Sequence, residues 1–184
     1  MNTNRLSKKI EDILNKQITK EAEASQVYLS YGSWADSEGY GGIANFLFRH
    51  AQEERNHMMK VMQYIMERGG RPKISAIAAP SKDPKNLQDC FEKTFNHEVD
   101  NTTAIYGIVN LAHEEKDWAT YNFAQWFVKE QIEEEKLIMD LLDKLKIAGG
   151  LKASNESLFI LDKALGKAKD SVPLAREASS DNPE

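Results

Sequence analysis

The fold is decided by residues 71–85, which read RPKISAIAAPSKDPK. This stretch carries Pro72, Pro80 and Pro84 and has no helical periodicity, although long helical patterns lie on both sides of it. A connection of this length is uncommon in a compact domain unless it has a structural task. Fully extended at ~3.3 Å per residue it spans roughly 50 Å, whereas the predicted helix before it, at ~1.5 Å per residue, is about 40 Å long. We therefore predict that the connection runs the whole length of a helical bundle.

Long segments with helical periodicity surround this connection, and nothing between them alternates with the period of a strand. A short amphipathic helix is predicted at residues 155–165, after a pair of glycines. The long helices are predicted at residues 5–36, 43–68, 86–113 and 117–147.

Short turns join the first helix to the second and the third to the fourth, so the helices of each pair are predicted to be antiparallel. A connection that spans the bundle then makes the second and third helices parallel. The predicted fold is an all-α four-helix bundle with one long crossover and a short fifth helix. One domain covers residues 1–165, and the polar tail at residues 166–184 is expected to be disordered.

Length, charge and composition exclude several classes of protein. The 184 residues suffice for one domain, and a formal charge of −5, from 29 acidic and 24 basic residues, argues against a nucleic-acid-binding protein. No apolar run approaches the ~20 residues of a membrane span, and the first residues lack the apolar core of a signal peptide. Cys90 is the only cysteine, and we interpret it as a small buried hydrophobic residue. We expect a cytoplasmic protein that binds neither membranes nor nucleic acids.

Each long helix carries a glutamate on its apolar stripe. Residues seven apart lie on nearly the same line of a helix, so an apolar or aromatic residue seven positions before and after marks such a glutamate. Glu130 and Glu135 also satisfy this test. One glutamate per helix satisfies it near mid-bundle, namely Glu21, Glu54, Glu98 and Glu134.

These four glutamates are also predicted to lie at one level of the bundle. Glu21 lies about 15 residues before the end of its helix and Glu54 about 12 residues after the start of the next, which at ~1.5 Å per residue places them within about 5 Å of the same height. Glu98 and Glu134 are placed similarly about the turn between their helices. His57, three residues after Glu54, shares its helical face. The sequence thus predicts four carboxylates and one imidazole together at mid-bundle.

A buried cluster of four carboxylates requires a counter-charge. Burying an unpaired carboxylate costs several kcal/mol, and no lysine or arginine is predicted at a comparable position, since Lys20 and Arg55 point off the apolar stripes. Two divalent cations would supply that charge. Oxygen ligands with one nitrogen suit iron or manganese better than a thiolate-binding metal, so we predict a dinuclear metal site.

Two longer motifs connect these residues to a known family. They read RHAQEERNHM at residues 49–58 and QWFVKEQIEEEK at residues 125–136, and they are joined by Glu21 with Tyr28 one heptad later and by the pair His97-Glu98. Together they resemble the ferritin family, and most nearly the bacterial non-haem ferritins, over residues 5–165. The resemblance implies the ferritin-like four-helix bundle predicted above.

The resemblance also implies a dinuclear ferroxidase site. One iron would be held by Glu21, Glu54 and His57, and the second by Glu54 as a bridge together with Glu98 and Glu134. Gln131 would lie beside the pair, and Tyr28 would be a hydrogen-bond donor and an electron source. A third iron position would take its ligands from Glu53, Glu130, Glu133 and Glu134. Without the resemblance, Tyr28 can equally be an ordinary core tyrosine, Glu53 and Glu133 solvated charges, and Trp126 a packing residue.

By the same resemblance, the function is iron storage. The chain would oxidise ferrous iron with dioxygen, or with peroxide, and keep the ferric mineral in a hollow homo-oligomer of 24 subunits, with the fifth helix at the fourfold axes. Arg55 stands where bacterioferritins have a haem-binding methionine, so haem is not expected. Glu134 is followed three positions later by Leu137, not by the second histidine of bacterioferritins and rubrerythrins. Animal ferritins line the threefold entry channels of their cages with acidic residues, and this chain has Ala124 at that place. The route by which iron would enter a cage is therefore not predicted.

Two other interpretations stay open at this point. One is a di-iron bundle that reduces peroxide or oxidises a substrate without forming a cage. The other is a metal-free helical scaffold or partner-binding bundle, in which the mid-bundle carboxylates would be accidental. Particle size separates the first interpretation from ferritin, and metal analysis separates the second.

Overall fold

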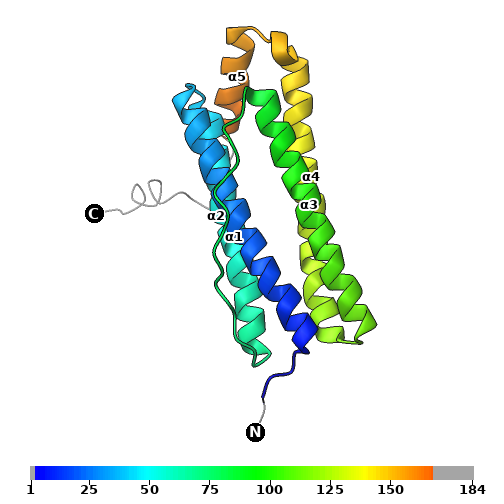
Figure 1. The fold of residues 1–184 in the computed structure, drawn as a ribbon. Helices are drawn as coiled ribbons and strands as arrows, with labels where there is room; N and C mark the ends of the chain where they lie inside the picture. Colours follow the sequence, from blue (N-terminus) through cyan, green and yellow to red (C-terminus); the bar gives the residue numbers. More distant parts are fainter. Residues whose placement is uncertain (1–2, 168–184) are drawn as a thin grey trace, which may run out of the picture.

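The computed structural model describes residues 3–167, and the predicted tail lies outside them from residue 168 onward. Four long helices lie side by side, and a short fifth helix packs at one end of them (Figure 1). The described residues contain no strand, so the predicted all-α class is confirmed. The elements are α1 (Lys8–Ser37), α2 (Gly41–Glu67), α3 (Leu87–Glu114), α4 (Trp118–Ala148), the 3-10 helix η1 (Gly150–Lys152) and α5 (Asn155–Gly166). None of the described helices is long and apolar enough to cross a membrane.

Side-chain caps set the starts of these helices. Ser7 accepts a hydrogen bond from the backbone N–H of Ile10, and the oxygens of Asn86, Asp117 and Ser154 cap α3, α4 and α5 in the same way. The first helix was predicted to begin at Arg5, which is wrong by one turn. The backbone N–H of Arg5 instead donates to the carbonyl of Arg68 at 2.8 Å, which holds the chain before the cap against the end of α2.

The predicted crossover runs along α1. At its beginning, the backbone N–H of Arg71 donates to Glu11 Oε1 at 3.1 Å, and that of Lys73 donates to Asn15 Oδ1 at 2.6 Å. Farther along, the hydroxyls of Ser81 and Tyr31 are hydrogen-bonded at 3.0 Å. Glu11 and Tyr31 lie near opposite ends of α1, so the segment passes along the bundle and α2 and α3 run parallel, as predicted (Figure 1).

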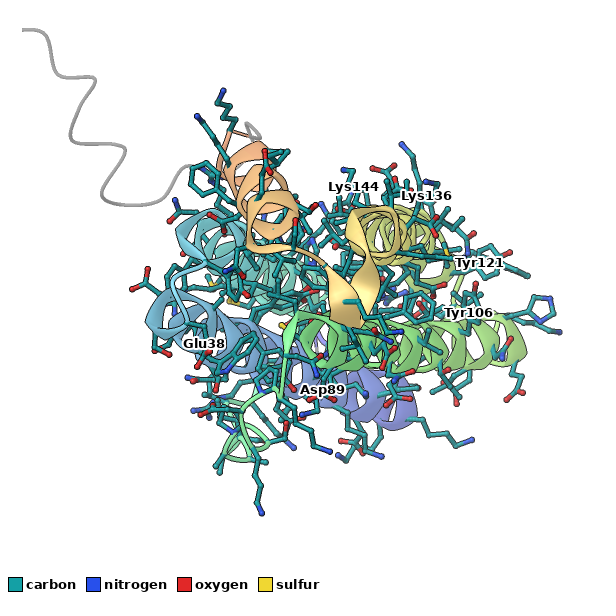
Figure 2. All side chains as sticks on the ribbon, turned by 90° about the horizontal axis from the view of Figure 1, so that it is seen from above. Glu38, Asp89, Tyr106, Tyr121, Lys136 and Lys144 are labelled. Atoms are coloured by element: carbon teal, nitrogen blue, oxygen red, sulfur yellow. The ribbon has the colours of Figure 1, made fainter. Side chains whose placement is uncertain are left out.

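The interior divides into two apolar clusters. The cluster nearer α5 includes Phe91 and Leu141, and the cluster nearer the start of α1 includes Ile10 and Ile105. In the end-on view, side chains of the four long helices fill the space between them, while Lys144 projects outward from α4 (Figure 2). Buried polar side chains, rather than apolar ones, occupy the level between the two clusters. This level is where the predicted glutamates lie.

The fifth helix packs on the beginning of α2. The backbone N–H of Ile43 donates to Asp162 Oδ1 at 2.8 Å, and Leu161 and Leu165 are buried in the cluster nearer α5. Gly42 permits this approach, because a Cβ there would lie 1.9 Å from the carbonyl oxygen of Asp162. Helix α5 therefore contributes to the core of its own chain.

Candidate metal centre

Each of the four long helices contributes one glutamate to the level between the apolar clusters. Glu21 and Glu98 are 0% exposed, Glu54 is 1% exposed and Glu134 is 4% exposed. They are placed there because each occupies the apolar stripe of its helix, as the sequence predicted. Glu54 and Glu134 each have an imidazole within ion-pair distance, that of His57 and that of His50, respectively.

Two groups of side chains, which share His57, can hold a cation. In the first, Glu21, Glu54 and His57 each offer a ligand atom, and these atoms all lie within 4.8 Å of one another. Glu54 and His57 are neighbours on α2, with His57 Nδ1 at 3.6 Å from Glu54 Oε2. This group is the predicted ligand set of the first iron.

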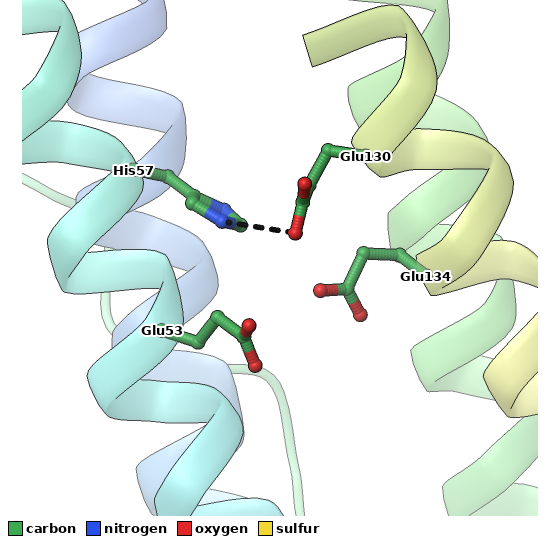
Figure 3. A group of neighbouring side chains, drawn as sticks. All are labelled: Glu53, His57, Glu130 and Glu134. Carbon is green, nitrogen blue, oxygen red and sulfur yellow. Dashed lines mark ion pairs between the residues drawn. The ribbon is translucent and has the colours of Figure 1, made fainter. Parts of the chain in front are cut away.

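The second group joins α2 to α4. Its members Glu53, His57, Glu130 and Glu134 offer ligand atoms within 4.8 Å of one another. Figure 3 shows Glu53 and His57 extending from α2 toward Glu130 and Glu134 on α4, with His57 Nε2 at 3.7 Å from Glu130 Oε1. The two nitrogens of His57 therefore face different groups. Glu133, also predicted here, is not brought to the group, because it is exposed and pairs with Lys129 at 3.5 Å.

Glu98 is held by neutral donors and belongs to neither group. Tyr28 Oη donates to Glu98 Oε1 at 2.7 Å, and Gln131 Nε2 lies 3.3 Å from Glu98 Oε2. Gln131 also lies 3.3 Å from Thr102 Oγ1, which itself donates to Glu135 at 2.6 Å. Tyr28 thus occupies the donor position that the sequence predicted for it.

Burial raises the pKa values of three glutamates of the centre, Glu54, Glu98 and Glu134. The pKa of Glu54 lies well above its usual 4.5, first because of burial and then because of the charges of Glu98 and Glu21. Burial and the charge of Glu98 also raise the pKa of Glu134 well above 4.5. The pKa of Glu98 is raised by burial, while hydrogen bonds from Tyr28 and Gln131 oppose the increase. Glu54, Glu98 and Glu134 therefore resist full ionisation until a cation is present.

Two carboxylate oxygens provide a test of whether a cation fits this centre. Glu54 Oε2 and Glu134 Oε2 are buried and have no hydrogen-bond donor among residues 3–167. Buried polar atoms normally have a partner, and an orphaned oxygen indicates an ion or water. Each orphaned oxygen belongs to a member of one of the two groups, and the set of carboxylates with imidazole suits a divalent metal such as iron or manganese. The residues present fit the predicted cation.

Sequence reasoning missed several buried polar residues around the centre. Gln17 and Asn101 donate to Glu21, and His50 Nε2 lies 3.9 Å from Glu134 Oε2. The signal that the sequence offers for them is their spacing, since Gln17 stands four residues before Glu21, Asn101 three after Glu98 and His50 seven before His57. Spacing alone does not distinguish a buried amide from a solvated one.

The sequence placed no lysine or arginine at a comparable position on the apolar stripes, but one arginine of these helices is buried. Arg49 on α2 is only 7% exposed. Trp126 has the predicted packing role, since its ring lies edge-on to His57 at 5.5 Å with Lys60 Nζ 4.1 Å from its centroid.

Comparisons with known proteins agree with this arrangement. A family model of the ferritin-like domain matches residues 11–148. A Haemophilus influenzae protein named as a bacterial non-heme ferritin-like protein is 42% identical over 161 residues, which are 88% of this chain and 96% of that protein. The bacterial non-heme ferritin of Campylobacter jejuni is 40% identical over 144 residues, which are 78% of this chain and 86% of the relative.

Similarity to a ferritin is also found among solved structures. An open pore ferritin from Archaeoglobus fulgidus superposes with a TM-score of 0.86 at 39% identity, covering 89% of this chain and 99% of that one. The resemblance to bacterial non-haem ferritins is confirmed, and the chain belongs to the ferritin family.

Proposed function

We propose that this protein stores iron by oxidising ferrous ions at a dinuclear site and keeping the ferric product inside a hollow cage of 24 identical subunits. The observation that carries the proposal is a pair of buried oxygens, on Glu54 and Glu134, that have no donor among residues 3–167. Both glutamates belong to groups whose ligand atoms lie within 4.8 Å of one another. The names of the relatives, all ferritins or ferritin-like proteins, support storage of iron.

The ligands divide between the ions as follows. Glu21, Glu54 and His57 bind the first ferrous ion, and Glu54 bridges to a second ion that Glu98 and Glu134 complete. Glu98 keeps its carboxylate in position through its hydrogen bonds from Tyr28 and Gln131.

A third ion has a separate site in the second group. It binds between α2 and α4, where Glu53, Glu130 and Glu134 face His57 Nε2. Glu133 remains a predicted ligand of this ion from the resemblance alone. Its exposed side chain would have to leave Lys129 to reach the group.

The chemistry is a transfer of two electrons. Each of two ferrous ions gives one electron, and dioxygen accepts the two electrons with two protons to form hydrogen peroxide. Cation binding releases the protons that the raised pKa values hold on Glu54 and Glu134. Tyr28 Oη donates a hydrogen bond to Glu98 Oε1. As an electron source, Tyr28 would serve the reduction of dioxygen beyond peroxide, which needs electrons in addition to the two from iron. Peroxide is the alternative oxidant, and we expect no haem.

The test is to add ferrous iron in air, record ferric absorbance and measure particle size. We expect rapid oxidation by a particle far larger than one 20.9 kDa chain. His57→Ala should retain the large particle and lose the rapid phase, whereas Asn56→Ala, at the neighbouring exposed position, should keep both. Rapid oxidation by a small particle would favour a di-iron enzyme without a cage. A protein that binds no iron would contradict the proposal.

The cellular location is also proposed. Burial raises the pKa of the Cys90 thiol to about 12, so this cysteine is an unreactive core residue. A chain whose single cysteine forms no disulfide suits the reducing cytoplasm, where we expect the protein to act.

A further inference from the structure

Glu21 differs from the other glutamates of the centre, because amide groups bind both of its oxygens. Gln17 Nε2 donates to Glu21 Oε1 at 2.7 Å, and Asn101 Nδ2 donates to Glu21 Oε2 at 3.2 Å. Gln17 comes from α1 and Asn101 from α3, and each is only 2% exposed. Two buried amides from different helices therefore converge on one carboxylate.

A third hydrogen bond closes this arrangement into a ring. Gln17 Nε2 also donates to Asn101 Oδ1 at 2.7 Å, so its two N–H groups serve Glu21 and Asn101. The oxygen of Asn101 is thereby used, and its NH2 group is directed to Glu21. Rotating the Asn101 amide by half a turn would set its oxygen against a carboxylate and its NH2 group against another NH2 group. The ring therefore permits one orientation of each amide.

The ring still leaves Glu21 able to bind a cation. Each carboxylate oxygen has two lone pairs, and each amide uses one of them. The remaining lone pairs are available on the side where Glu54 and His57 offer their ligand atoms within 4.8 Å. Glu54 Oε2, by contrast, has no donor within the described residues. Glu21 is thus the ligand of the first group whose position is fixed by other side chains.

We propose that Gln17 and Asn101 are positioning residues that hold the Glu21 carboxylate ready for the first cation. This inference rests on the proposed metal centre. Partners that orient a ligand commonly contribute 10- to 100-fold to metal affinity, because the ligand is ordered before the metal arrives. The amides do not touch the metal themselves.

The experiment is a titration of the full-length, metal-free protein with zinc, a redox-inert cation that binds oxygen and nitrogen ligands. Glu21→Gln first identifies which zinc-binding step depends on Glu21. Asn101→Leu keeps the side-chain size and removes the donor, and should weaken that same step about 10- to 100-fold. The control is Thr94→Val on the same helix, since Thr94 is buried, donates to the carbonyl of Cys90 and belongs to neither group of ligand atoms. It should leave the step unchanged.

A double-mutant cycle separates positioning from general damage. In the Glu21→Gln background, Asn101→Leu should cause no further loss of zinc affinity, because the amides act only through Glu21. Equal losses in both backgrounds, or no loss in either, would overturn the proposal. If Asn101→Leu fails to fold, Gln17→Met tests the same ring from α1. A wild-type chain that binds no zinc would instead overturn the metal centre itself, and the role of the ring with it.

Discussion

At the scale of single residues, the environment divides four chemically identical glutamates into two kinds. Glu21 and Glu98 accept hydrogen bonds from neutral donors on both oxygens. Glu54 and Glu134 each keep one buried oxygen that no donor in the described part of the chain reaches, and their pKa values are raised well above the usual 4.5. The second kind therefore carries the electrostatic cost of the centre when no cation is bound.

This difference predicts that Glu134→Gln stabilises the chelated protein. When the pKa of a carboxyl group is higher in the folded chain than its usual 4.5, the group adds to the free energy of unfolding below pH 4.5. This contribution is lost as the pH rises through the folded pKa. The gain from the neutral amide should therefore grow from about pH 4.5 toward neutrality. Each kcal/mol raises the melting temperature by about 2–4 °C in a chain of this size. With zinc the order should reverse, because the variant has lost a ligand.

Glu98→Gln is the matched control for that measurement. Its carboxylate already has Tyr28 and Gln131 as donors, so the variant should gain less thermal stability than Glu134→Gln in the chelated state. A lower melting temperature for chelated Glu134→Gln, at neutral pH, would show that this carboxylate is not strained by its neighbours.

The third ion site can be tested with two neighbouring glutamates of α4. Glu130 faces His57 Nε2 at 3.7 Å, whereas Glu133 points outward to Lys129. Glu130→Ala should alter repeated turnover severalfold and keep the first rapid oxidation, and Glu133→Ala should have a much smaller effect. The measurement is ferric absorbance over successive ferrous additions. Equal effects of both variants would mean that Glu133 turns inward when iron binds.

The sequence predicted the metal ligands better than it predicted the side chains that hold them in position. A carboxylate on an apolar stripe is a conflict that only a partner or a cation resolves, so Glu21, Glu54 and Glu134 could be found from their spacing. Gln17 and Asn101 create no such conflict, because a neutral amide is acceptable on either face of a helix. Their role depends on the packing of α1 against α3, which the sequence does not encode locally.

At the scale of elements, the predicted ends of the helices lie within three residues of the observed ends, whereas the contacts of the irregular segments were not predicted. Glycine pairs and caps give helix ends a local signal, and α5 began at Asn155 as predicted. The length of the crossover predicted its path. Its hydrogen bonds to Glu11, Asn15 and Tyr31 could not be predicted, because a segment without periodicity gives no register against its neighbour.

The contact of α5 with α2 leads to a prediction about two adjacent glycines. Gly42→Ala would place a Cβ 1.9 Å from the backbone oxygen of Asp162, so the helices must separate. Overpacking of this kind typically costs about 1–3 kcal/mol, which corresponds to a melting temperature lower by several degrees. Gly41→Ala is the control, because a Cβ there meets nothing within 4 Å. Equal melting temperatures of the two variants would show that α5 is not packed on α2 in solution.

At the scale of the whole molecule, two large apolar side chains of α5 are exposed on the single chain. Phe159 is 64% exposed and Ile160 is 60% exposed on the outer side of α5, while Leu161 and Leu165 are buried on its inner side. The helix therefore has one apolar face for its own chain and another that suits a neighbouring subunit. This arrangement is more specific than the amphipathic helix expected from the sequence.

Replacing the outer residues should weaken assembly without unfolding the chain. In the double variant Phe159→Ser and Ile160→Ser, we expect smaller particles by size-exclusion chromatography and unchanged helix content by circular dichroism. Leu161→Ala is the complementary control, since it should lower the melting temperature through the core of the chain. Full-size particles from the double variant, with wild-type thermal stability, would exclude α5 from the contacts between subunits.

The division of the interior into two apolar clusters has a consequence for cooperativity. Each cluster holds one end of the bundle, and the level between them consists of carboxylates that repel one another without a cation. The two ends of the chelated protein should therefore open as separate units, with different amide hydrogen-exchange protection around Ile10 and Leu141. A bound zinc ion acts as a cross-link between helices and should bring both ends to a common opening free energy. The metal ion that the protein binds would then also make the two ends of the subunit unfold together.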